Sequence, residues 1–288
     1  MLGNLVKEIR TSKGMTQIEI SESANITQST YSKFENDQIE VRASTLDRIL
    51  SKLDISMEEF KFILNGYQLS DKDRILNKFF QVPYNNIALL NEIYEECNQM
   101  LQKEENVLIR DIQTLCKSLA PLLESGEFES GRLYARQIWQ RLSHNNNLYY
   151  YDIYLLNAIL FVFPLDEMLG IYQYLKRGFE KYKNFQNMSR VALSTSLNIA
   201  VVLITEKLYK DALEELEITL PKCKEQKLFI PLAIGYVRKG ICLNNISNNG
   251  NEWINKGLFM LEVLEEHDTY EHLKKEIELF DPNYFISQ

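Results

Sequence analysis

The stretch Thr16-Gln-Ile-Glu-Ile-Ser-Glu-Ser-Ala-Asn-Ile-Thr-Gln-Ser-Thr-Tyr-Ser-Lys-Phe-Glu35 decides the fold of the N-terminal part of the chain. Thr16 is followed three residues later by Glu19, which is the capping-box pattern that starts a helix. A second helix can start at Thr27, directly after Asn25-Ile26, because threonine is a favourable N-cap. The stretch therefore predicts two short helices joined by a tight turn, which is the geometry of a helix-turn-helix.

Apolar residues at helical spacing extend this pattern to five short helices over residues 2–64. The first helix carries the apolar stripe Leu2, Leu5, Val6 and Ile9. Gly14 can end that helix, while Ser44 or Thr45 and then Ser56 can start the fourth and fifth helices. Because Asn65-Gly66 ends the series, we expect a five-helix domain over residues 1–66.

The second helix of the predicted helix-turn-helix offers polar side chains that can reach DNA, because it enters the major groove with its N-terminal end first. Its exposed positions hold groups that can hydrogen-bond to base edges or carry positive charge: Gln28, Ser29, Ser32 and Lys33. The net charge of −8 argues against a general nucleic-acid coat protein, but a sequence-specific binder needs positive charge only at its docking face. A small helical domain with solvated polar faces is the alternative.

Residues 2–64 resemble the lambda-repressor/Xre class of helix-turn-helix proteins, on the Thr16-Gln17 start and the Phe34-Glu35 end of the motif. The resemblance implies that Gln17 bonds a phosphate and that Asn36 and Arg42, in the loop that follows, track the DNA backbone. It also implies a structural ion pair between Arg10 and Glu35, so Arg10 is not counted as a DNA contact. The candidate DNA-binding residues are Thr16, Gln17, Gln28, Ser29, Ser32, Lys33, Asn36 and Arg42.

The bulk composition is that of a globular protein with about two domains. Of its 288 residues, 45% are hydrophobic and 25% are charged, which is ordinary for such a protein. The longest apolar runs, such as residues 199–204, are shorter than the roughly 20 residues that span a bilayer. The N-terminus lacks the basic and apolar regions of a signal peptide, so we expect a cytoplasmic protein without a membrane partner.

The sequence offers no catalytic, metal or cofactor site. The four cysteines have no CxxC spacing, and isolated cysteines are more often small buried apolar residues than ligands. The sequence contains no P-loop, HExxH or GxSxG motif, and His144, His267 and His272 are expected to be ordinary surface residues. We therefore expect neither an enzyme nor a metal or cofactor.

Residues 67–288 are expected to form a tetratricopeptide-like helical-repeat domain, which makes the whole chain all-α. Glycine and proline are sparse, with 11 and 6 residues, so helices should be long and turns short. A turn, an aromatic or apolar residue and then a small residue recur at a spacing of roughly 35–45 residues. The copies are Gly126-Glu-Phe128 with Ala135, Phe163-Pro-Leu165 with Gly170, Tyr209 with Ala212, and Asn251-Glu-Trp253 with Gly257.

The helix expected over residues 188–205 should belong to the inner layer of these repeats, which lines a concave binding surface. Arg190, Ser194 and Asn198 recur every four residues along it and form a polar stripe. Leu193, Leu197 and Val201 form the adjoining apolar stripe. The asparagine can bond a peptide backbone through a donor and an acceptor, although the stripe can equally face solvent or another helix.

Most of the chain resembles the Rgg family of peptide-responsive regulators of Gram-positive bacteria. The resemblance rests on the Xre-like N-terminal domain, the segment 148–156, the Ser196-Leu-Asn198 step and the helix that contains residues 256–261. It implies a homodimer, for which an inverted-repeat operator is expected, and a short secreted peptide that docks in the concavity. We expect this peptide to be apolar. Family receptors often carry an arginine near Phe161, so recognition of an acidic group there is in doubt. The candidate peptide-binding residues are Tyr154, Phe161, Arg190, Ser194 and Asn198.

Two alternatives to a peptide-controlled regulator remain open. In one, the repeats serve only dimerisation and bind no ligand. With or without a ligand, we expect the homodimer to be held mainly by the C-terminal helices, including Trp253, Leu258, Leu261 and Leu264. In the other, the repeats form an adaptor that binds only protein. The candidate docking residues of the N-terminal domain argue against the adaptor.

Overall fold

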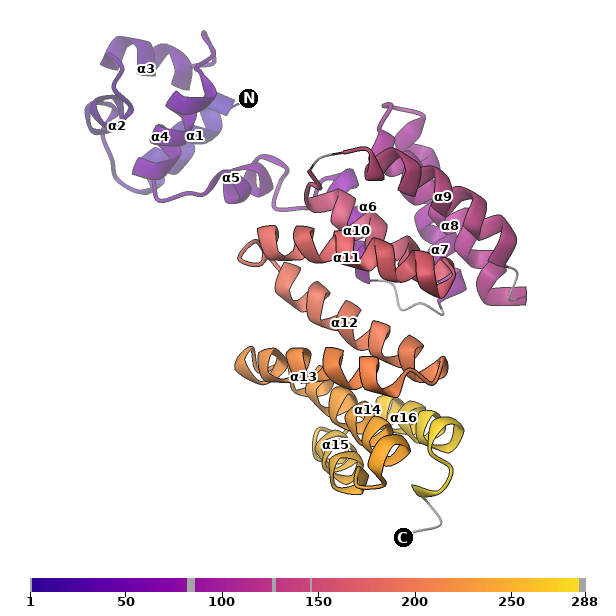
Figure 1. Cartoon of the computed structure of the whole chain (residues 1–288). Helices are drawn as coiled ribbons and strands as arrows, with labels where there is room; N and C mark the ends of the chain where they lie inside the picture. The colour runs from indigo at the N-terminus through magenta and orange to yellow at the C-terminus, as the bar shows by residue number, and fades with distance from the viewer. Residues whose placement is uncertain (1, 82–85, 126–127, 146, 285–288) are drawn as a thin grey trace. The chain divides into compact units, whose positions relative to one another are not determined.

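The computed structural model describes residues 2–81, 86–125, 128–145 and 147–284. Its internal contacts divide the chain into two compact units, residues 1–131 and 132–288. Every regular element in the described residues is helical, which confirms the all-α fold (Figure 1). The predicted domain boundary after Gly66 stays a prediction, because the division at residue 131 leaves three further helices in the same unit as the N-terminal domain.

The N-terminal domain contains the five predicted helices: α1 (Leu2–Ser12), α2 (Gln17–Ala24), α3 (Gln28–Glu35), α4 (Ala43–Lys52) and α5 (Met57–Leu64). Thr16 and Glu19 form the predicted capping box at α2, and Thr27 and Ser56 cap α3 and α5. The fourth helix begins at Ala43, slightly before the predicted start, because the helix-starting carbonyl belongs to the preceding Arg42.

The core of this domain forms under the turn between α2 and α3. Its buried members are Val6, Ile20, Ala24, Tyr31, Phe34, Ile49, Leu50, Leu53 and Phe60. The helix α1 approaches α3 so closely that a Cβ atom at Gly3 would lie 1.9 Å from the Phe34 carbonyl oxygen. The Asp37 carboxylate accepts the Gly3 amide at 2.8 Å and thereby satisfies the start of α1. The helix α3, the second helix of the predicted helix-turn-helix and its recognition helix, thus packs on the apolar core and contacts α1 near its C-terminal end.

The rest of the first unit is α6 (Asp71–Gln81), α7 (Ile87–Leu101) and α8 (Val107–Ser125), of which α7 and α8 pack most extensively against each other. Lys78 on α6 bonds the carboxylates of Glu92 and Glu96 on α7, each at 2.6 Å. Buried residues of α7 and α8, such as Ile93 and Ile112, supply the apolar contacts.

The second unit consists of paired helices stacked along the chain (Figure 1). They are α9 (Phe128–Ser143), which begins just before the unit, α10 (Tyr150–Ile159), η1 (Leu160–Val162), α11 (Leu165–Tyr182), α12 (Met188–Thr205), α13 (Tyr209–Glu225), α14 (Phe229–Ser247), α15 (Asn251–Val263) and α16 (His267–Phe280). From α12 onward each helix packs against the next one, and α12 also packs against α14 and α14 against α16, as stacked repeats do.

Polar contacts join alternate helices, which run in the same direction. Asn157 on α10 accepts the Thr195 hydroxyl on α12 at 2.6 Å, and Arg238 on α14 donates to the Leu197 carbonyl of α12 at 2.8 Å. Arg238 also forms a buried two-point ion pair with Glu276 on α16, at 2.6 and 3.0 Å. The sequence separations of these pairs are 38, 41 and 38 residues, so they follow the repeat period. We call α10, α12, α14 and α16 the inner layer.

Two of the predicted repeat signatures differ in their packing. Gly257 on α15 allows close approach to α14, because a Cβ atom there would lie 2.5 Å from the Ala233 carbonyl oxygen. Gly170 on α11 is exposed and faces no neighbour, so its small size is not used for packing. The signature Gly126-Glu-Phe128 falls partly outside the described residues, since residues 126–127 are not described.

The helix α12 is apolar enough to resemble a membrane span. Its 18 residues have a mean hydropathy of 1.5, so among the described residues it alone meets the length and composition of such a span. It packs against α11, α13 and α14, and many of its side chains are buried there. A helix that is apolar on most of its circumference is also what the core of a repeat stack requires.

Candidate nucleic-acid interface and ligand groove

The recognition helix α3 has one face in the core and the other in solvent. Tyr31 and Phe34 are buried, whereas Gln28, Ser29 and Lys33 are exposed. The remaining candidate on this helix, Ser32, is half-buried, and its carbonyl accepts the Asn36 side-chain amide at 2.9 Å. The side chains predicted to read bases therefore lie on the face that is free to enter a groove.

A chain of hydrogen bonds links the core of the domain to the recognition helix. Arg10 forms the predicted ion pair with Glu35 through two contacts, at 2.6 and 3.0 Å, and donates to the Met15 carbonyl at 2.6 Å. The side-chain amide nitrogen of Gln17 donates to the Glu35 carboxylate at 2.7 Å. The side-chain oxygen of Gln17 accepts a hydrogen bond from the side-chain amide of Gln28 at 3.2 Å. The orientation of Gln28 is therefore set by a buried ion pair two steps away.

The ion pair between Arg10 and Glu35 is buried, yet hydrogen bonds stabilise the charged forms of both side chains. Burial alone would raise the pKa of Glu35, but hydrogen bonds from Arg10 and Gln17 outweigh it and hold that pKa below its usual range. The hydrogen bond with Glu35 raises the pKa of Arg10, and burial raises the pKa of Tyr31. Both partners of the ion pair therefore stay charged at neutral pH.

The other predicted DNA contacts lie around α3. Thr16 is exposed at the start of α2, where its hydroxyl serves the capping box. Asn36 is exposed at the end of α3, and Lys7 donates to its side chain at 3.4 Å. Arg42 is exposed at the start of α4. Gln17 is half-buried, and its side-chain amide has partners within the protein in Glu35 and Gln28, while its contact with a phosphate stays a prediction.

The predicted polar stripe on α12 lies on the open side of that helix. Arg190 and Ser194 are exposed and Asn198 is half-buried. None of the three side chains forms a hydrogen bond or ion pair with the described part of the chain. The stripe thus keeps the hydrogen-bonding capacity of three side chains available to a ligand.

The apolar stripe beside it has a different role from the one expected. Leu193 and Leu197 are buried between the helices, and only Val201 of the three remains half-buried. The polar residues of α12 therefore lie on its open side, whereas the two leucines face the core. The polar and apolar stripes do not lie side by side in a groove. Tyr154 on α10 and Phe161 on η1 are both half-buried.

A polar network that the sequence did not indicate lies on the opposite side of α12. The Tyr172 hydroxyl on α11 lies 2.7 Å from the Ser196 hydroxyl and donates to Glu215 on α13 at 2.5 Å. Lys176 bonds the same carboxylate at 2.8 Å. Burial acts to raise the pKa of Glu215, but its hydrogen bonds hold that pKa below the usual range. The network joins α11, α12 and α13, and explains Ser196 without a ligand.

Arg238, Glu276 and Asn157 were also missed by sequence reasoning. Their one signal is the separation of 38 residues within the pairs Asn157–Thr195 and Arg238–Glu276, which equals the repeat spacing. A search for complementary polar residues at that spacing would have found both pairs.

The residues predicted for dimerisation fall into two groups. Leu258 and Leu261 are buried in the core of the second unit and cannot form a subunit interface. Leu264 is exposed, and Trp253 is half-buried against Tyr236, with ring centroids 5.1 Å apart. Exposed apolar side chains that the sequence did not single out, Phe259 and Val263, lie on the outward face of α15.

The cysteines are consistent with buried apolar residues. Cys97, Cys116, Cys223 and Cys242 are buried free thiols. Burial raises the pKa of Cys223 to about 11 and of the other three to about 12. No cluster of metal-ligating side chains occurs within the described residues.

Two family models match the chain. One, described as a helix-turn-helix, matches residues 6–60. The other, described as the C-terminal domain of the HTH-type transcriptional regulator Rgg, matches residues 142–275. The search of curated proteins found no match.

Solved structures share the fold over nearly the whole chain. The SHP pheromone receptor Rgg2 of Streptococcus dysgalactiae has a TM-score of 0.72 at 16% identity, covering 96% of this chain and 98% of that one. PlcR of Bacillus thuringiensis, in complex with the peptide PapR7 and DNA, has a TM-score of 0.66 at 21% identity, covering 94% and 98%. ComR from S. thermophilus, in complex with DNA and its signalling peptide ComS, has a TM-score of 0.62 at 14% identity, covering 96% and 98%.

Proposed function

We propose that this chain, which belongs to the Rgg family of HTH-type transcriptional regulators, binds an operator through α3 and is controlled by a short apolar peptide bound on the inner layer of its repeats. The solved relatives PlcR and ComR are in complex with both DNA and a peptide, which supports the same pair of partners here. A cytoplasmic location follows, since a transcription regulator acts where the DNA is.

The observation that supports base reading is the fixed position of Gln28. An amide that is already oriented by Gln17 loses little conformational freedom when it binds a base. A glutamine can bond adenine through both a donor and an acceptor, whereas Lys33 can bond guanine or a phosphate. Thr16, Asn36 and Arg42 lie beside α3 and are proposed to contact the DNA backbone.

The observation that supports a peptide ligand is the unused polar stripe on α12. An extended peptide needs partners for its backbone amides and carbonyls when it is buried. Asn198 offers a donor and an acceptor, and Arg190 offers charged donors. Tyr154 on α10 and Phe161 on η1, which directly follows α10, add half-buried aromatic surface suited to apolar peptide side chains.

The DNA-binding part is tested with single variants on the operator. We expect Gln28→Ala and Lys33→Ala each to weaken binding by about 1–3 kcal/mol if they touch bases. Lys61→Ala, an exposed lysine on α5, is the matched control and should change binding little. The operator should be an inverted repeat with half-sites about one helical turn apart or a multiple of it. Unchanged footprints with both recognition-helix variants would remove the assignment.

The peptide-binding part is tested by calorimetry with peptides synthesised from short open reading frames that neighbour the gene. We expect Asn198→Ala to cost roughly 1–3 kcal/mol of peptide affinity, because a peptide group loses its partner. Operator binding without peptide should not change. Asn249→Ala, an exposed asparagine between α14 and α15, is the control. If no peptide binds, the alternative in which the repeats serve only dimerisation is favoured.

A further inference from the structure

Six aromatic rings gather where the inner-layer helices α10 and α12 begin. Tyr150 lies at the centre, with ring centroids 5.0 Å from Tyr154, 5.1 Å from Phe185 and 6.3 Å from Tyr182. Tyr151 and Tyr149 flank it along the chain. We call Tyr150, Tyr154, Tyr182 and Phe185 the aromatic cluster. Two of the six side chains are exposed, Tyr149 at 64% and Phe185 at 44%.

The aromatic cluster is continuous with the proposed groove. Tyr154 is one helical turn after Tyr150 on α10, and their hydroxyls lie 3.3 Å apart. The Tyr150 hydroxyl donates to the Gln186 side chain at 2.7 Å, in the turn that leads into α12. Gln186 has a positive φ of 46°, which is an uncommon conformation for a residue other than glycine. One turn further along the chain, Arg190 starts the polar stripe.

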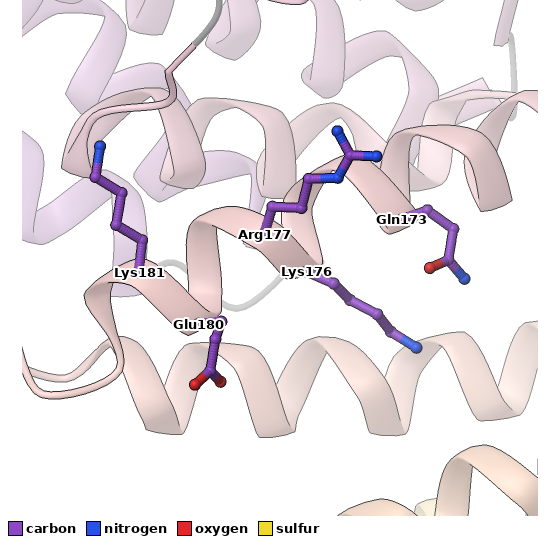
Figure 2. A pocket seen from close by; sticks show the side chains of 5 residues that line it. All are labelled: Gln173, Lys176, Arg177, Glu180 and Lys181. Carbon is purple, nitrogen blue, oxygen red and sulfur yellow. The ribbon is translucent and has the colours of Figure 1, made fainter.

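The same end of the inner layer is locally positive in a protein of net charge −8. Residues 176–190 contain five lysines and arginines but one acidic residue, Glu180. Several of these cations are already engaged, since Lys176 bonds Glu215 and Lys183 bonds Glu180. Figure 2 shows the side chains that line a shallow hollow on α11. Arg177 and Lys181 point to one side of this helix, and Lys176 points to the other. Arg190 is exposed, and no carboxylate in the described part of the chain pairs with it.

We propose that this end of the groove receives the carboxyl-terminal residue of the peptide, with its large apolar side chain on the aromatic cluster and its carboxylate on Arg190. The inference rests on the proposed function, since it assigns the ligand chemistry of one end of that site. In the aromatic cluster Phe185 is exposed and the three tyrosines are half-buried, so the cluster offers aromatic surface to an apolar side chain. A guanidinium binds a carboxylate as an ion pair with two parallel hydrogen bonds, which a neutral amide-capped end cannot form.

The test uses three synthetic probes with the full-length protein: N-acetyl-Leu-Ile-Phe with a free carboxylate, the same tripeptide as the carboxyl-terminal amide, and N-acetyl-Leu-Ile-Ala. Ligand-observed saturation-transfer NMR gives their dissociation constants. We expect the acid to bind about fivefold more tightly than the amide, and Arg190→Gln to abolish that difference. We expect Phe185→Ser to abolish the preference for phenylalanine over alanine, and Phe185→Leu to retain part of it.

Two matched controls separate the site from general surface effects. Lys210→Gln removes an exposed cation of α13, and Phe229→Ser removes an exposed ring at the start of α14. Neither control should change any of the three dissociation constants. The proposal is overturned if wild type binds acid and amide equally, if the controls cause the same losses, or if no probe binds at millimolar concentration.

Asn198→Ala distinguishes this inference from the proposed function. Probe binding that depends on Asn198 but ignores Arg190 and Phe185 would keep the peptide groove and refute the end site. Probe binding that depends on Arg190 and Phe185, together with no effect of Asn198→Ala on any longer peptide, would keep the end site and refute the assigned course of the groove along α12.

Discussion

The substitution Arg10→Met should turn a buried ion pair into a buried uncompensated charge. Arg10 is 8% exposed and Glu35 is fully buried, with two contacts of 2.6 and 3.0 Å between them. Removing one partner of such a pair typically costs about 3–5 kcal/mol, because the other charge stays buried. Glu35 would keep the Gln17 amide, at 2.7 Å, and the neighbouring Tyr31 side chain, neither of which carries a positive charge. We therefore expect α1 and α3 to lose most of their protection against unfolding.

The pH dependence of this cost has a definite sign. In wild type the pKa of Glu35 is lowered, so its contribution to stability is present above the unfolded value of about 4.3 and is lost as pH falls through the folded pKa. In Arg10→Met burial is no longer opposed by the arginine, so the pKa of Glu35 should rise above the unfolded value. The stability difference between variant and wild type should then be largest at neutral pH and shrink as pH falls toward about 4.

Hydrogen exchange of the full-length protein, followed by mass spectrometry on peptides from α3, measures this difference at about pH 7 and about pH 5. Lys13→Met, an exposed lysine just beyond α1, should cost less than about 0.5 kcal/mol. The double variant Arg10→Met with Glu35→Leu should recover much of the loss, because neither charge remains. An Arg10→Met cost below about 1 kcal/mol, or an equal cost at both pH values, would refute the reasoning.

Three further predictions concern the DNA contact, the thiols and the dimer. Gln17→Ala should weaken operator binding by about 1 kcal/mol in a gel-shift titration, since Gln28 loses its orienting partner; wild-type affinity would count against the hydrogen-bond chain. The four buried cysteines should resist iodoacetamide at about pH 8 in the native protein and react only after denaturation, so rapid native labelling would contradict their burial. The pair Phe259→Ser and Val263→Ser should weaken homodimerisation roughly tenfold in analytical ultracentrifugation, whereas Ile218→Ser, at an exposed site on α13, should not.

The helices of the N-terminal domain could be predicted from the sequence because their caps and turns depend on residues that are close together in the chain. The capping box of Thr16 and Glu19 and the cap at Thr27 act over three residues, and the turn between them needs only Asn25 in a left-handed conformation. The start of α4 was misplaced because Ser44 and Thr45 are plausible caps, yet the first helical hydrogen bonds go to the Arg42 carbonyl. The hydrogen bond between Gln17 and Gln28 could not be predicted from the sequence, because it depends on the angle at which α2 and α3 cross.

The packing of the repeats was harder to predict from the sequence, because its polar contacts join residues about 40 positions apart. Turns and small residues predicted the helical pairs, but they did not reveal that Arg238 holds both the Leu197 carbonyl and Glu276. Leu258 and Leu261 were assigned to a subunit interface because an apolar residue on a helix gives no sign of which neighbour covers it. In a stack where each helix has several neighbours, an apolar stripe belongs first to the core.

The same reasoning explains why α12 is the best candidate for ligand recognition. A helix surrounded by neighbours must satisfy or expose each polar side chain, because an unpaired buried one is costly. Thr195 is satisfied by Asn157, and Ser196 by Tyr172, on the two sides where α12 meets other helices. Arg190, Ser194 and Asn198 lack such partners among the described residues and lie on the remaining side. Polar groups left over after internal pairing has been assigned are therefore a stronger guide to a ligand than the polar stripe read from the sequence alone.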